Sequence, residues 1–130
     1  MKIPTSELTG VALDWVVAKC EGATDFWFDT VATHWVKLNG IDRALRYGWA
    51  QSYLPSTDWA QGGPIIEREM IATSRGGSYT ENFWMASWGF SDERIYGPTP
   101  LIAAMRCYVA SKLGDTVNIP DELTNEGATK

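Results

Sequence analysis

The sequence predicts an α+β fold, a sandwich in which about three helices pack on a small, largely antiparallel sheet of three or four strands. Three features support this prediction: a capped amphipathic segment near each end of the chain, aromatic and β-branched runs between them, and an Asn-Gly turn at residues 39–40. The chain has 130 residues, of which 45% are hydrophobic. This length is sufficient for one domain with its own core.

Two helices are predicted from capping residues and from apolar side chains at helical spacing. The first is expected over residues 5–22, with Thr5 or Ser6 as its N-cap. The last is expected over residues 99–114, with Thr99 as its N-cap and a proline in the first turn. A glycine ends each segment, as is common at helix C-termini.

The segments between these helices favour strands. Residues 24–38 are rich in aromatic and β-branched side chains and are expected to form one strand, followed by a type I′ turn at residues 39–40. Residues 41–48 fit either a short helix that ends at Gly48 or the start of a returning strand, and a returning strand over residues 46–54 is favoured. A further strand is expected over residues 78–90. The expected turn and loop segments are residues 72–77 and 91–97.

The stretch "STDWAQGGP" at residues 56–64 combines helix-capping residues with two glycines and a proline. Two arrangements fit it. The first is a helical turn from Thr57, a break at the glycines, and a helix that begins at Pro64, a position where proline is tolerated. The second is a single kinked helix over residues 57–71.

This stretch is also the predicted ligand site. Hydroxyl groups, glycine amides and a helix N-terminus can together hold a phosphate or carboxylate, and an arginine one turn further can add a bidentate contact. We therefore expect a small anionic or nucleotide-like ligand there, whereas plain capping and a kink are the structural alternative. The expected binding residues are Ser56, Thr57, Asp58, Trp59, Gly62, Gly63 and Arg68.

A second candidate surface is aromatic, because the chain contains seven tryptophans. On one sheet face these rings could bind a base beside an arginine, form an interface with a host or phage protein, or simply belong to the core. Exposed aromatic rings would also favour a homodimer. The rings considered are Trp27, Trp35, Trp84, Trp88, Tyr53 and Tyr79.

Charge and composition exclude several classes of function. The net charge is −5, and residues 115–130 carry four acidic residues and one basic residue. We therefore expect an acidic arm and tail after a domain formed by residues 1–114. Nucleic-acid binding is not expected, because the chain has no basic stripe. No apolar run approaches the roughly 18 residues that a membrane span needs.

No catalytic residue, metal site or cofactor is predicted. The chain has one histidine, His34, and its two cysteines, Cys20 and Cys107, do not form a metal-binding motif. Two free thiols in a reducing cytoplasm are the expected state. No serine, cysteine or histidine is arranged as a nucleophile with its base, so the sequence favours a binding protein over an enzyme.

Three blocks of the sequence carry a family resemblance: "TSELTGVALDWVVAKCEG", "STDWAQGGPIIERE" and "YGPTPLIAAMRCYVASKLGD". Together they cover about half of the chain. They resemble the NinX-like proteins of tailed bacteriophages and the broader phage ABA-sandwich domain. The resemblance implies a phage or prophage origin, action in the cytoplasm of the host bacterium, and an α-β-α layered fold. It brings no reaction and no catalytic residues.

Overall fold

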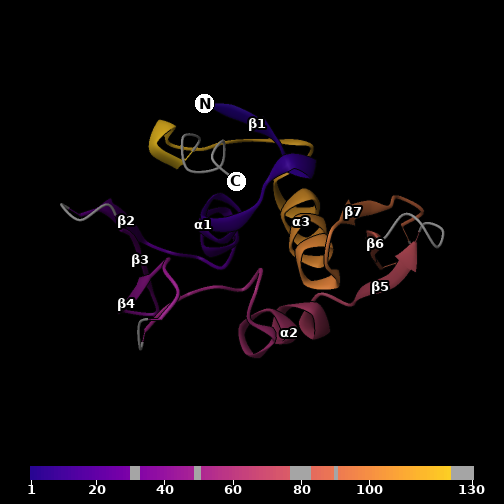
Figure 1. Ribbon diagram of the computed structural model, residues 1–130, viewed down its shortest axis with the longest axis horizontal. Coiled ribbons are helices and arrows are strands. Elements are labelled where there is room, and N and C mark those ends of the chain that lie inside the picture. Colours follow the sequence, from indigo (N-terminus) through magenta and orange to yellow (C-terminus); the bar gives the residue numbers. More distant parts are fainter. Residues whose placement is uncertain (30–32, 49–50, 77–82, 90, 124–130) are drawn as a thin grey trace.

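A computed structural model describes residues 1–29, 33–48, 51–76, 83–89 and 91–123 of the chain (Figure 1). Over these residues the fold is α+β, as predicted, with three α-helices and eight short strands in three antiparallel sheets. The strands are β1 (Lys2–Pro4), β2 (Asp25–Phe28), β3 (His34–Leu38), β4 (Ile41–Ala44), β5 (Ile71–Gly76), β6 (Phe83–Trp88), β7 (Ile95–Gly97) and β8 (Thr116–Asn118). The helices are α1 (Gly10–Cys20), α2 (Trp59–Arg68) and α3 (Pro100–Leu113), preceded by a 3₁₀ turn, η1 (Thr5–Glu7).

The predicted first helix is divided in two. Residues 5–7 form the 3₁₀ turn η1, and α1 begins only at Gly10, so the expected N-cap at Thr5 or Ser6 is wrong. The Thr5 hydroxyl instead donates to the carbonyl of Gly114 at 2.7 Å, which ties the chain entry to the end of α3. Residues 12–18 of α1 are all buried, because other elements surround this helix.

The predicted last helix is confirmed at both ends. The Thr99 hydroxyl accepts a hydrogen bond from the amide of Ile102 at 3.0 Å, and Pro100 is the first helical residue. Gly114 follows the helix with a φ of 89°, a conformation that favours glycine. The helices α1 and α3 pack together at the centre of the molecule (Figure 1).

The β2–β4 sheet lies beside α1 and contains the predicted turn (Figure 1). Asn39 and Gly40 have φ values of 52° and 79°, as a type I′ turn requires. The predicted strand over residues 24–38 is instead the antiparallel pair β2 and β3. The returning strand is β4, which begins directly after the turn, so the alternative of a strand that starts within residues 41–48 is confirmed and the short helix is wrong. The favoured strand over residues 46–54 is wrong for its described residues, 46–48 and 51–54.

The β5–β7 sheet packs against α3 on the opposite side (Figure 1). The predicted strand over residues 78–90 is confirmed where it coincides with β6, while residues 78–82 and 90 lie outside the described residues. The expected turn at 72–77 is wrong over residues 72–76, which belong to β5, while residue 77 lies outside the described residues. The expected loop at 91–97 is confirmed for residues 91–94 and wrong for residues 95–97, which form β7. The strands β5 and β7 form because they pair with the two sides of β6.

The layers differ from the α-β-α order implied by the resemblance. The helices α1 and α3 lie inside, with the β2–β4 sheet on one side and the β5–β7 sheet on the other (Figure 1). The first and last described strands, β1 and β8, form a third small sheet. Within the segment expected as an acidic arm, residues 116–118 are therefore paired, whereas residues 124–130 lie outside the described part of the chain.

Candidate functional site

The predicted ligand segment forms one helix, α2, so the single-helix arrangement is confirmed and a helix that begins at Pro64 is wrong. Asp58 is the N-cap, and its Oδ1 accepts a hydrogen bond from the amide of Ala60 at 3.0 Å. Pro64 lies inside the helix. The helix N-terminus therefore lies at Trp59, and the two glycines follow it.

Gly62 and Gly63 lie within the helix and do not form an open loop. The Gly62 amide donates to the Asp58 carbonyl at 2.9 Å. A Cβ atom at Gly62 would lie 2.3 Å from the Pro55 carbonyl oxygen and 2.6 Å from Leu101 Cδ1. Glycine at position 62 is thus explained by the close approach of α2 to α3, and its amide is already used within the helix.

The residues before the helix differ in accessibility. Ser56 is 1% exposed, and its amide donates to Asp14 Oδ1 at 2.8 Å. Its hydroxyl is buried and has no hydrogen-bond partner among the described residues. Thr57 and Trp59 are exposed. Of the expected hydroxyl groups, only that of Thr57 is therefore open to solvent.

Arg68 ends the helix whose N-cap is Asp58, and it is already engaged. Its guanidinium forms a bidentate ion pair with Glu21, with Nη2–Oε2 at 2.5 Å and Nη1–Oε1 at 3.1 Å. Its Nε donates to Glu69 at 2.9 Å. The structure therefore does not bring Arg68 together with the capping residues, and ligand binding by this set stays a prediction.

The Arg68 ion pairs belong to a larger polar cluster at the C-terminal ends of the three helices. Tyr108 donates its hydroxyl hydrogen to Glu21 at 2.5 Å, and Lys112 pairs with Glu69 at 3.1 Å. Burial raises the pKa of the Tyr108 hydroxyl, and its hydrogen bond to Glu21 raises it further. The positive charges of Arg68 and Lys112 are balanced by the negative charges of Glu21 and Glu69, so the cluster is suited to joining the three helices.

The aromatic candidates do not share one sheet face. Trp27 and Trp35 stack on the β2–β4 sheet, with ring centroids 6.2 Å apart and planes 3° apart. Trp84 and Trp88 lie instead on β6. Tyr53 is buried, and Tyr79 lies outside the described residues. The prediction of a single aromatic face is therefore wrong, because the rings are divided between two sheets.

A pocket that sequence reasoning missed lies where η1, β7 and α3 meet, and we call it the arginine pocket. Its volume is about 410 Å³. Arg106 of α3 is held there by two main-chain carbonyl oxygens, because its Nε donates to Leu8 at 2.7 Å and its Nη1 donates to Tyr96 at 2.9 Å. The lining residues are Ser6, Phe83, Arg94, Ile95, Tyr96, Gly97, Pro98 and Arg106.

The arginine pocket contains two cationic side chains. Among the described residues, no carboxylate forms an ion pair with Arg94 or Arg106. Burial lowers the pKa of the Arg106 guanidinium from its usual range, although an arginine stays charged. Two rings adjoin these cations: Phe83 and Tyr96 meet edge to face, with centroids 5.5 Å apart.

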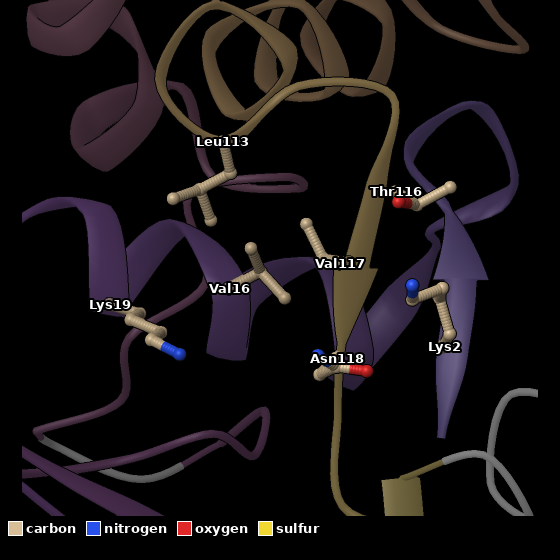
Figure 2. A pocket seen from close by; sticks show the side chains of 7 residues that line it. All are labelled: Lys2, Val16, Lys19, Leu113, Thr116, Val117 and Asn118. Atoms are coloured by element: carbon tan, nitrogen blue, oxygen red, sulfur yellow. The ribbon is translucent and has the colours of Figure 1, made fainter.

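A second pocket, which we call the lysine groove, lies between α1, the end of α3 and the β1–β8 pair (Figure 2). Its volume is about 340 Å³. Figure 2 shows apolar side chains of all three regions meeting in it, with a lysine on either side. The lining residues are Lys2, Val16, Lys19, Leu113, Thr116, Val117 and Asn118.

Two other classes of site are absent from the part of the chain that the structure describes. No group of three or more histidine, cysteine or acidic side chains is placed to hold a metal ion. None of the described helices has the length and apolar character to cross a membrane.

Comparison with known proteins gives one family. The family model described as "Bacteriophage P22, NinX" matches residues 4–112 of this chain. A search of curated proteins found no match.

Proposed function

The chain belongs to the bacteriophage P22 NinX family and is a phage accessory protein, and we propose that it is a noncatalytic protein that binds a nucleotide-like small anion. The family match confirms the resemblance carried by the three sequence blocks. We further propose that the protein acts in the cytoplasm of the host bacterium. The free cysteines Cys20 and Cys107 suit that reducing compartment.

The observation that supports anion binding is the state of Arg106. Its guanidinium is half-buried and is held by the Leu8 and Tyr96 carbonyl oxygens, with no described carboxylate as counter-ion. Burial of an unpaired charge is costly unless a partner compensates it. Since Nη2 takes no part in these two hydrogen bonds, it still has N–H groups to offer. An anionic ligand would supply the missing charge and accept those bonds.

The other lining residues favour a ligand with a flat ring. Tyr96 is 50% exposed, and a base could stack against a ring at this site. Arg94 lies on the same pocket and adds a second guanidinium that can reach a phosphate. A phosphate joined to a base would use both the charges and the rings, whereas inorganic phosphate would use the charges alone.

The same reasoning favours the arginine pocket over the predicted segment on α2. Arg68 already has two carboxylate partners, Glu21 and Glu69, so a ligand would have to displace them. The Gly62 amide is bonded within its helix. Arg94 and Arg106 need no such rearrangement, because no described carboxylate competes for them.

Titration calorimetry with AMP, GMP and inorganic phosphate tests this proposal. We expect a nucleoside monophosphate to bind more tightly than phosphate. Each of the variants Arg94→Gln and Arg106→Lys should weaken nucleotide binding by about tenfold to a hundredfold, because each loses a charge-assisted contact worth about 1.5–3 kcal/mol. Tyr96→Leu should bring nucleotide and phosphate affinities closer together.

Arg68→Gln is the matched control, since it removes one guanidinium from the predicted α2 site and leaves the arginine pocket intact. Its nucleotide affinity should equal that of the unmodified chain. Loss of binding in Arg68→Gln but not in Arg94→Gln would return the site to α2. If none of the three ligands bound to the protein, the proposed function would be refuted.

A further inference from the structure

The strand β8 has one edge that no described strand covers. Met1 and Ile119 exchange both main-chain hydrogen bonds, at 2.7 and 2.9 Å, and the Thr5 amide donates to the Asp115 carbonyl at 2.8 Å. Hydrogen-bonded pairs alternate along an antiparallel ladder. The main-chain groups of the intervening residues Thr116 and Asn118 therefore point away from β1.

The lysine groove runs beside this open edge. The groove is lined by Thr116 and Asn118 of β8 and by residues of α1. Figure 2 shows the side chains of Val16 and Val117 directed toward each other, with Leu113 beside them. Val16 and Val117 are buried, whereas Leu113 is 43% exposed. A chain laid along β8 would thus meet free main-chain groups and the apolar side chain of Leu113 at the same time.

The charges around the groove select the kind of chain that fits. Lys2 and Lys19 lie on either side of it, and neither forms an ion pair with a described carboxylate. Asp121, which is near in sequence, is paired with the N-terminal amine at 3.6 Å. Two ammonium groups without counter-ions, in a protein of net charge −5, make this groove complementary to acidic side chains.

We propose that the lysine groove binds an extended acidic segment of a partner protein, which adds to β8 as a third strand of the β1–β8 sheet. Main-chain hydrogen bonds to Thr116 and Asn118 hold the segment, as in other cases of strand addition. Its apolar side chains lie on Leu113, which is the exposed apolar residue of the groove. Its carboxylates, on the alternate positions, reach the lysines. This partner is distinct from the small anion of the arginine pocket, so either proposal can fail alone.

A peptide that alternates valine and glutamate, VEVEVEV with blocked ends, is the probe for this test. We expect saturable binding by fluorescence anisotropy of the labelled peptide. The largest amide chemical-shift changes in the protein should occur at Thr116, Asn118 and their neighbours. The peptide VKVKVKV, which has the same pattern with the opposite charge, should bind at least about tenfold more weakly.

Two variants separate strand addition from simple charge attraction. Thr116→Pro removes an outward amide and leaves the ladder to β1 intact, because proline is tolerated where an edge N–H faces outward. It should lower peptide affinity about fivefold or more while thermal unfolding changes little. The double variant Lys2→Glu, Lys19→Glu should abolish the preference for VEVEVEV. Lys37→Ala, on the distant strand β3, is the control and should bind normally.

The peptide itself gives a second measure if Thr116→Pro does not fold. N-methylation of alternate peptide amides blocks strand hydrogen bonds and keeps every carboxylate, so it should abolish binding to the unmodified protein. Equal binding by the N-methylated peptide, by VKVKVKV, or by free glutamate at the same concentration would overturn strand addition. Chemical-shift changes centred on the arginine pocket would overturn it as well.

Discussion

Gly62 and Gly63 are adjacent in α2, yet alanine should have opposite effects at the two positions. At Gly62 a Cβ would lie 2.3 Å from the Pro55 carbonyl oxygen and 2.6 Å from Leu101 Cδ1. At Gly63 the nearest atom is Trp59 Cε3, at 3.9 Å, which is an ordinary contact. The two substitutions are chemically identical, so the surroundings alone decide the difference.

The magnitude follows from two opposing contributions. Alanine inside a helix is favoured over glycine by about 1 kcal/mol. Overpacking costs about 1–3 kcal/mol, and Gly62 belongs at the upper end because the main-chain oxygen of Pro55 cannot rotate away. Gly62→Ala should therefore lose about 2 kcal/mol of unfolding free energy, and Gly63→Ala should gain up to about 1 kcal/mol.

Urea denaturation followed by circular dichroism and tryptophan fluorescence measures this difference. With a denaturant slope of about 1.5–3 kcal/mol/M, a gap of about 3 kcal/mol separates the two midpoints by about 1–2 M. If Gly62→Ala were as stable as Gly63→Ala, the close approach of α2 to α3 at this position would be refuted. Gly62 would then again be a candidate for a ligand loop.

Three further predictions concern the thiols, the acid response and the association state. Burial raises the pKa of Cys20 to about 11 and that of Cys107 to about 12. At pH 8 both thiols should therefore react with Ellman's reagent more than about a hundredfold slower than free cysteine does. Fast reaction of either thiol in the native protein would contradict this prediction. The hydrogen bond from Arg68 lowers the pKa of the Glu69 carboxyl group. The stability that this carboxylate contributes should therefore be fully present above about pH 4.3, the usual glutamate pKa, and should be lost as the pH falls through the lowered pKa of Glu69. Urea midpoints of Glu69→Gln should accordingly change less over that acid range than those of the unmodified chain, and equal slopes would refute the effect. Trp27 is 37% exposed, and if this face forms the expected homodimer, sedimentation should show a concentration-dependent dimer that Trp27→Lys abolishes.

The sequence predicted best those elements whose signals are local. The cap at Thr99 and the stop at Gly114 define α3 without reference to any other part of the chain. The Asn39-Gly40 turn is equally local, because both residues accept a positive φ. These elements are correct because short-range backbone preferences determine where they begin and end.

The strands β5 and β7 could not be predicted in the same way. Four of the six residues of β5 are exposed, and its small polar side chains give no clear alternation. The strand β7 has only three residues, which is too short for a pattern. Both are strands because β6 lies between them and pairs with each. Long-range pairing therefore supplies what local propensity does not.

The arginine pocket illustrates the same limit for a site. The hydrogen bond from Arg106 to the Leu8 carbonyl joins residues 98 positions apart, and Arg94 reaches the pocket from a different segment. No motif connects these residues in the sequence. The one signal that the sequence offered was the two basic residues of α3, which contains no acidic residue, and the net charge of −5 conceals it.

The distribution of ion pairs explains why an acidic protein offers two cationic sites. In the helix-end cluster, Arg68 and Lys112 are balanced by Glu21 and Glu69, so that region attracts neither sign strongly. Arg94, Arg106, Lys2 and Lys19 have no such partners among the described residues. Surface fields of this kind are screened over about 10 Å at 0.1 M salt. Because its lysines are solvent-exposed, peptide binding at the lysine groove should weaken steeply with added salt, whereas nucleotide binding at the half-buried Arg106 should weaken less.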